Sequence, residues 1–448
     1  MQLSKVRIGK ISSVITLILC CTTEAEESNQ VPGSNLEDFF TAAINFSPEL
    51  RIAEENLNIS SARKKAANAQ LLPQINAGAS VSNNRQTQLN RFREFDGERY
   101  FVSLTQTLFN WQQFASRKQA RLLESQVEEE YYYGLSSLLT EVAERYFYVL
   151  QSQDALNSLE SEIEALNNQL SQIQSLYDLQ LAQITDLYQG QASLASAQAQ
   201  RFQLEAELAL NQESLRSISG LDVGPLYELD ALVEIPDLEF DQDYYLKQAQ
   251  NRNHQILARE FALRAANQDV SAQRGAFMPQ ISLIAQRQDS DVGFDNLQIA
   301  QTDTTYIGLN LSIPIFSGGR NRAGVDEAIS RRSIAEHELR LVQLQARENV
   351  RLAHLQVQTS SAQTEAAEVL VDSTALAAQA MQQGFSLGTV TSVDVLNALR
   401  DQFQAERGLQ QTRYDHIRYL LTLKREAGTL TAEDISQVSE WLVPPQAR

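Results

Sequence analysis

The side chains that could do chemistry in this sequence gather at two predicted turns between helices, residues 180–185 and 388–392. Gly388 suits the left-handed backbone that ends a helix, because it has no Cβ. Thr391 and Asp394 have the spacing of a capping box, in which each side chain bonds the other residue's backbone N–H. This pattern predicts that Asp394 stabilises the start of a helix and leaves a negative charge beside a turn.

No group of residues predicts an enzyme or a metal centre. The chain contains no nucleophile–base motif, no glycine-rich phosphate loop and no HExxH sequence. Its histidines lack the spacing of metal ligands; they are His254, His337, His354 and His416. A net charge of −19 argues against nucleic acid as a partner. We therefore expect no catalytic residue, no cofactor and no metal.

Residues 1–25 have the features of a secretory signal peptide. Lys5, Arg7 and Lys10 precede a short apolar stretch, and small residues at positions 23 and 25 predict cleavage after Ala25. Both cysteines fall in this segment, and whether either one carries a lipid stays open. No later stretch holds 18 consecutive apolar residues, so a membrane-embedded form would need strands closed into a barrel.

The rest of the chain matches itself at an offset of about 206–208 residues. Leu72-Pro73-Gln74-Ile75 matches Met278-Pro279-Gln280-Ile281, and Gly220 matches Gly428. We interpret this as an internal duplication. It predicts a first structural repeat at 26–220, a linker at 221–241, a second repeat at 242–430 and a C-terminal tail at 431–448.

Each repeat is predicted to contain a helix, two strands, a very long helix, a turn and a helix. The strands, about 9–12 residues long, alternate apolar and polar side chains, as in a barrel strand between lipid and water. Residues 83–98 and 289–304 are predicted to be exposed loops between strands. The long helices, about 111–179 and 319–386, would be rods of about 100 Å. The shorter helices, about 36–71 and 184–219, would match a long helix when stacked end to end.

Four strands cannot close a barrel, because even small barrels need about eight. An open sheet in lipid would leave unpaired backbone groups at its edges. Two copies would give a filled barrel of about eight strands, and three would leave room for a pore. The pattern predicts an oligomer but does not fix the number of copies.

Several segments, in this order and spacing, resemble the TolC family of outer-membrane efflux proteins. They include Ser47-Pro48-Glu49-Leu50, Leu71-Leu72-Pro73-Gln74-Ile75, Ile313-Pro314-Ile315-Phe316 and Val393-Asp394-Val395-Leu396. The resemblance implies an α+β membrane protein of the outer membrane. It would be a homotrimer with a 12-strand β-barrel, four strands per chain, continued by a 12-helix coiled-coil tunnel. It also implies export together with a periplasmic adaptor and an inner-membrane pump or ABC transporter.

The resemblance also implies a gate at the periplasmic tip. An acid at the position of Asp394 would face the lumen, and three copies would form a negative ring. This chain departs from the family pattern, with Asn397 where a second acid is common and Gln180 where glycine is expected. Asp186, beside Thr185, matches an acid that bonds a Tyr and an Arg in the closed tip; Phe385 and Val390 occupy those two positions and cannot form the bonds. We therefore expect the tip of this protein to open more readily than the tip of a relative that has the full set of bonds.

The alternative function is that of a soluble periplasmic coiled-coil adaptor. An adaptor has one helical hairpin and soluble β-domains, so the duplicated strand pairs argue against it. The exported substrate and the identities of the pump and adaptor stay open.

Overall fold

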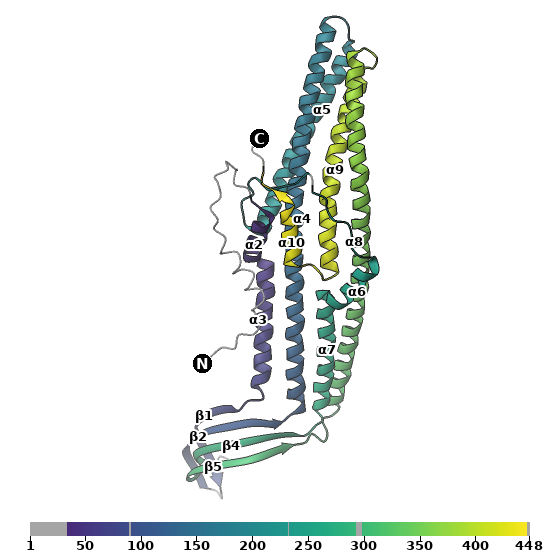
Figure 1. Cartoon of the computed structure of the whole chain (residues 1–448). Helices are drawn as coiled ribbons and strands as arrows, with labels where there is room; N and C mark the ends of the chain where they lie inside the picture. The colour runs from purple at the N-terminus through teal and green to yellow at the C-terminus, as the bar shows by residue number, and fades with distance from the viewer. Residues whose placement is uncertain (1–33, 89–90, 232, 293–297, 446–448) are drawn as a thin grey trace, which may run out of the picture.

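The protein is an elongated body of long helices with a four-stranded sheet at one end (Figure 1). The computed structural model describes residues 34–88, 91–231, 233–292 and 298–445. The predicted signal peptide lies outside the described residues. Within the described ranges, every helix is either too short or too polar to cross a membrane.

The helices follow the predicted order. The first half contains α2 (Leu36–Phe46), α3 (Pro48–Ala69), α4 (Trp111–Asp178) and α5 (Ile184–Ser219). The second half contains α6 (Gln242–Arg252), α7 (His254–Gly275), α8 (Arg320–Ser386) and α9 (Ser392–Glu426), and α10 (Ala432–Glu440) follows. The 68 residues of α4 and 67 of α8 contain no proline, which would remove a backbone donor and interrupt the helix.

Caps explain where the helices begin. Pro48 opens α3, where its missing N–H is harmless, and the Ser47 hydroxyl accepts a hydrogen bond from Leu50 N at 3.3 Å. Asn110 separates β2 from α4, and its side chain accepts a hydrogen bond from Gln113 N at 3.2 Å. Ser47 thus ends α2 and starts α3, and Asn110 links a strand to a helix within one residue.

The sheet has the order β1-β2-β4-β5, with all neighbouring strands antiparallel. Its strands are β1 (Gln74–Gln88), β2 (Arg91–Phe109), β4 (Gln280–Val292) and β5 (Gln298–Ser312). A second, two-stranded sheet joins β3 (Glu228–Leu229) to β6 (Leu442–Val443), so the segment between the halves pairs with the C-terminal segment.

The strands are longer than predicted, at 15, 19, 13 and 15 residues. Most of the segments 83–98 and 289–304, predicted to be loops, continue the two hairpins as paired strand. Cross-strand pairs such as Arg85–Glu94 hold these polar extensions, which lack the apolar alternation used for the prediction. The fourth strand ends at Ser312, before Pro314, which has no N–H for a ladder.

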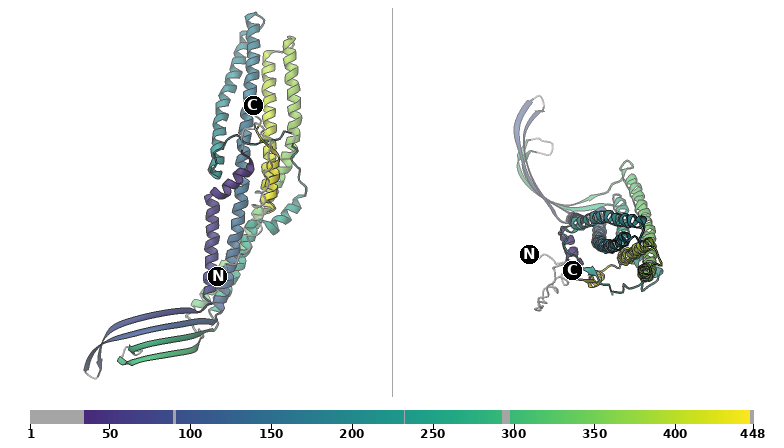
Figure 2. Two further views of the ribbon diagram at one scale, coloured as in Figure 1. Left: turned by 60° about the vertical axis from the view of Figure 1, so that its left-hand side comes forward. Right: turned by 90° about the horizontal axis from the view of Figure 1, so that it is seen from above.

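The helices form one curved layer, in which short helices stacked end to end alternate with long ones. Helices α3 and α5 pack along α4, α4 packs along α7 and α9, and these two pack along α8. Figure 2 shows this layer from the side and from above. The predicted end-to-end stacking is confirmed. The layer therefore has two outer edges, one made by α3 with α5 and the other by α8.

The largest apolar core lies at mid-height, where α2, α4, α9 and α10 meet the linker. Tyr146 and Phe147 of α4 are fully buried there, in contact with the rings of Phe39 and Tyr414 respectively. Burial raises the pKa of Tyr146, and its hydroxyl donates to the carbonyl of Tyr227 at 2.9 Å. These aromatics join the two halves of the chain through apolar packing.

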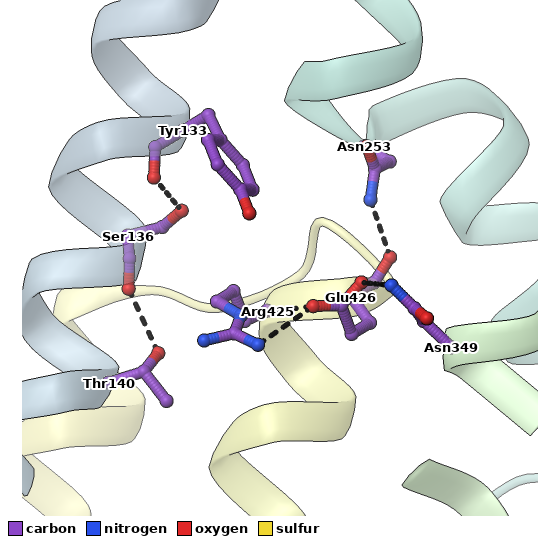
Figure 3. A network of polar contacts seen from close by, with 7 residues as sticks. All are labelled: Tyr133, Ser136, Thr140, Asn253, Asn349, Arg425 and Glu426. Atoms are coloured by element: carbon purple, nitrogen blue, oxygen red, sulfur yellow. Dashed lines mark hydrogen bonds and ion pairs between the residues drawn. The ribbon is translucent and has the colours of Figure 1, made fainter. Parts of the chain in front are cut away.

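Each half contains the same kind of junction. In it, the last helix of the half ends beside the break between the two short helices that begin the half. Gly220 ends α5 beside Phe46, and Gly428 follows α9 beside the backbone of Arg252 and Asn253. Figure 3 shows the second junction. The Asn253 side chain donates to the carbonyl of Glu426 at 2.8 Å.

The buried carboxylate of Glu426 fixes this second junction. It accepts hydrogen bonds from Asn349 of α8 at 3.1 Å and from Arg425 at 2.8 Å (Figure 3). On the neighbouring α4, the hydroxyls of Ser136 and Thr140 donate hydrogen bonds within their own helix, to the carbonyls of Tyr133 and Ser136 respectively. A buried charge with these partners is stabilised, whereas an unpaired one would be costly.

We predict that Gly428→Ala destabilises the protein by more than about 1 kcal/mol, because Gly428 has a left-handed φ. A Cβ there would also lie 2.5 Å from the carbonyl of Arg252. The control is Gly408→Ala, within α9, where a Cβ meets no atom within 4 Å and should stabilise the helix. Thermal unfolding in detergent measures both changes. A Gly428→Ala variant as stable as the Gly408→Ala variant would contradict the prediction.

Candidate functional site

The turn between α8 and α9 has the predicted geometry. Gly388 has φ +73, the left-handed conformation, and its N–H bonds the carbonyl of Phe385 at 3.0 Å. Thr389 closes the turn, with its N–H 2.9 Å and its hydroxyl 3.0 Å from the carbonyl of Gly384. The end of α8 is therefore capped by its own backbone.

Thr391 and Asp394 form the predicted capping box. The Asp394 carboxylate accepts hydrogen bonds from the Thr391 hydroxyl at 2.6 Å and backbone N–H at 3.0 Å. In return, Asp394 N donates to the Thr391 hydroxyl at 3.3 Å. These bonds, led by that from the hydroxyl, hold the pKa of Asp394 below its ordinary value. The side chain therefore stays charged near neutral pH while it remains exposed to solvent.

Phe385 and Val390 point into an apolar cluster and are half-buried. They pack against Ala378, Val395 and Leu399, at the contact between α8 and α9. Both positions thus contribute apolar packing within the second hairpin, and neither side chain carries a group that could bond an acid.

The turn between α4 and α5 is built differently. Gln180 has φ +59, so a non-glycine residue takes the left-handed position that Gly388 holds in the second hairpin. Gln183 precedes α5 at the cap position, but its side chain makes no cap hydrogen bond. The Thr185 hydroxyl donates a hydrogen bond to the side-chain oxygen of Gln183 at 3.3 Å. Asp186, in the first turn of α5, is half-exposed. Among the described residues, none forms a hydrogen bond or ion pair with its carboxylate, so this acid is available to other groups.

Within one chain, the structure brings only part of the predicted site together. Phe385, Gly388, Val390 and Asp394 share the second turn, whereas Thr185 and Asp186 belong to the first. Across the described ranges, no hydrogen bond or ion pair joins the two turns. Asn397 lies one turn beyond Asp394 and lines a groove between α5 and α9, of about 530 Å³.

The contacts that do join the two hairpins lie along the seam between α4 and α9, and sequence analysis missed them. Arg418 donates to Gln151 at 3.2 Å, and Tyr414 donates to Asp154 at 2.6 Å. Nearer the tips, Arg407 pairs with Glu162 at 2.8 Å, with their side chains only 17% and 7% exposed. No local pattern could have revealed the last pair, because its members are 245 residues apart.

The comparisons with known proteins identify the family. The family described as "Outer membrane efflux protein" matches residues 41–221 and 245–429. "Outer membrane protein TolC" of Vibrio cholerae is 27% identical over 93% of this chain and 95% of its own length. "Alkaline protease secretion protein AprF" of Pseudomonas aeruginosa is 25% identical over 90% of this chain and 86% of its own length.

The fold is that of solved outer-membrane channels. The crystal structure of CusC superposes with a TM-score of 0.78, covering 92% of this chain and 95% of that chain at 20% identity. The resemblance to the TolC family is thus confirmed, and the predictions of no enzymatic activity and of an outer-membrane location are supported by the same relatives. The chain belongs to the outer membrane efflux protein family and is an outer-membrane efflux or secretion channel protein.

Proposed function

We propose that three copies of this chain close into one channel that carries substrates from the periplasm or cytoplasm to the exterior. Four strands from each copy would form a 12-strand barrel in the outer membrane. The four helical columns of each copy would form a 12-helix tunnel across the periplasm. The repeated order of elements in the two halves supports the duplication that would make the tunnel wall quasi-regular.

One observation carries this proposal: the sheet and the helix layer leave their open edges on the same two sides. Strand β1 follows α3 and β5 precedes α8, and each is an edge strand of the sheet formed by the described residues. The α8 edge exposes an apolar stripe, namely Ile334, Leu341, Leu344, Leu352, Leu355, Val369 and Leu376. The opposite edge exposes Ile52, Ile59, Tyr188, Phe202 and Leu210. Two different apolar edges suit a head-to-tail contact, which closes into a ring.

The spacing of the α8 stripe supports helix-to-helix contact between copies. Ile334, Leu341 and Leu355 fall in one heptad register, as does Leu376 farther along. Their faces point away from Ala346, Val350 and related residues that pack within the chain. A heptad stripe of exposed leucines is typical of a coiled-coil seam that lacks its partner.

An oblique apolar band on one face of the sheet supports insertion in lipid. On β1 the band covers Ile75 to Val81, and on β5 it covers Ile307 to Leu311. Register places Ile75 level with Ile307, through Leu104 and Ala285. From that level the band runs toward the hairpin turn on β1 and toward the helices on β5. A flat bilayer would produce this slope if the strands are tilted, as barrel strands are.

We predict that Leu341→Asp with Leu355→Asp abolishes the trimer, because each aspartate would be buried against a neighbouring copy in place of a leucine. Losing each leucine's burial alone removes about 2 kcal/mol. The control is Gln343→Asp, on another face of α8 and exposed. Light scattering after size-exclusion chromatography in detergent measures the assembly. A double variant that remains trimeric, or a control that dissociates equally, would count against the proposed interface.

The tip would act as a gate lined by Asp394. Three carboxylates held charged by their caps would attract cations and repel anions at the entrance. Because the side chains of Phe385 and Val390 have no polar group, no bond from them to Asp186 or Thr185 would hold the tip closed. This arrangement supports a tip that opens at lower cost than one with the full set of bonds.

The tips also suit contact with other proteins of an export machine. Leu179, Leu181 and Leu387 are each more than two-thirds exposed at the ends of the hairpins. We infer that a periplasmic adaptor covers these leucines and connects the channel to an inner-membrane pump or ABC transporter.

We predict that Asp394→Asn lowers the cation preference of the open channel while keeping the helix start, because the amide oxygen can still accept the cap bonds. The matched control is Asp434→Asn, since Thr431 and Asp434 form the same capping box on α10, away from the tips. Reversal potentials in a potassium chloride gradient report the selectivity of each trimer. Equal selectivity of the Asp394→Asn variant and the unmodified protein would show that Asp394 only caps a helix.

A further inference from the structure

The two hairpins of the sheet have the same register. In the first hairpin, Ile75 of the segment that matches between the halves lies opposite Leu104. In the second hairpin, Ile281 of the matching segment lies opposite Leu311. Each position on β1 therefore has an equivalent on β4, and each position on β2 has an equivalent on β5. Counting along the strands from these two pairs identifies the other equivalent positions.

The strands that meet at the centre of the sheet are equivalents of the strands at its two edges. Strand β2 pairs with β4, so that Val102 lies opposite Arg287 and Leu104 lies opposite Ala285. The equivalent of β2 is β5, and the equivalent of β4 is β1. Both β5 and β1 are edge strands of the sheet formed by the described residues. The central contact is thus a template for a contact between the β5 edge of one copy and the β1 edge of another.

Helix α3, beside the β1 edge, presents apolar side chains that its equivalent buries. Helix α7 packs along both α4 and α8, and its equivalent, α3, packs along α4. Ala258 and Ala265 of α7 are only 3% and 2% exposed. Counting from the caps that open the two helices, the equivalent residues of α3 are Ile52 and Ile59, which are 63% and 48% exposed. The edge helix therefore carries larger apolar side chains at positions that are buried in α7.

Helix α5, on the same edge, differs from its equivalent α9 in the same way. Asp186 and Asp394 hold equivalent places in the first turns of these helices. Two residues farther along stand Tyr188 of α5 and Leu396 of α9. Leu396 is buried in an apolar cluster with Leu166 of α4, whereas Tyr188 is exposed. An exposed tyrosine at the position of a buried leucine supports a helix of a second copy as the cover of this edge.

We propose that neighbouring copies meet in the way that the two halves of one chain meet. Leu309 holds the position equivalent to Val102, and Val81 holds the position equivalent to Arg287. Because Val102 lies opposite Arg287 in the sheet, Leu309 would lie opposite Val81 of the next copy. The inference rests on the proposed trimer, and it adds the register at which the copies pair.

This register keeps the apolar band on one face and makes it continuous. It also places Leu311 opposite Ala79 of the next copy, and both pairs lie within the band. The band on β5 would therefore meet the band on β1 of the next copy and continue around the closed sheet. A slip of one residue would bring opposite faces together. A slip of four residues would place Val81 opposite the polar Thr305.

Disulfide cross-linking of the assembled protein tests the register. The test variant is Val81→Cys with Leu309→Cys, and the matched control is Val81→Cys with Thr305→Cys, which also joins exposed positions of β1 and β5. Directly opposite residues have Cα atoms about 4.5–5.5 Å apart, within the range of a disulfide. Thr305 would lie about 13 Å along the strand from the position opposite Val81. All variants also carry Cys20→Ser and Cys21→Ser, which remove the native thiols.

We expect copper phenanthroline to join at least about ten times as many chains in the test variant as in the control. Denaturing electrophoresis without reductant measures the joined fraction. Strands β2 and β4 separate the two positions within one chain, so each disulfide joins two copies. A second pair in the same register, Ala79→Cys with Leu311→Cys, should react as readily as the first.

The outcomes separate the register from the proposed trimer. Light scattering of the unmodified protein and of the reduced variants first establishes their assembly. If trimers form and the control reacts as strongly as the two test pairs, or if neither test pair reacts, the register is overturned while the trimer stands. If the unmodified protein forms no trimer, the proposed function and the register are overturned together.

Discussion

The backbone groups at the edges of the sheet constrain everything else in this molecule. Strands β1 and β5 each present a row of N–H and C=O groups that no other strand in the described part of the chain pairs. In hydrocarbon, each unpaired group costs several kcal/mol. Pairing β5 of one copy with β1 of the next removes both edges, and the helices that flank these strands then bring their exposed apolar stripes together. A single head-to-tail contact would satisfy the sheet and the helical wall at once.

The chemistry of such a channel lies in the placement of charges along a lumen rather than in a catalytic cluster. At the tips, Asp394 carries a negative charge, and its hydrogen bonds with Thr391 hold its pKa below the ordinary value. Along the wall, buried polar pairs join the hairpins beside apolar packing, and the polar pair nearest the tips is Glu162 with Arg407. At about 1.5 Å per residue, this pair lies roughly 20–25 Å from the turns. Among the described residues, the hairpins beyond it are joined by apolar packing. Such packing is non-directional and allows the tips to move more easily than a bonded network would.

Much of the fold could be predicted from local patterns. Three features depend only on neighbouring residues, and the structure confirms them. They are the unbroken helix over 111–178, the cap at Asp394 and the left-handed Gly388. The predicted strand ends were wrong because cross-strand pairs stabilise the polar extensions of the hairpins. The alternation of side chains along one strand does not reveal such pairs. Glu162 could not be assigned a partner, since its pairing depends on how two distant helices pack.

The central claim is that neighbouring copies pair the edges of the sheet. Hydrogen–deuterium exchange of the detergent-solubilised protein tests it most directly, because a paired amide is protected and an unpaired edge amide is not. The account predicts that the amides of β1 and β5 exchange as slowly as those of the central strands β2 and β4. Fast exchange along β1 and β5, with protection confined to β2 and β4, would contradict it.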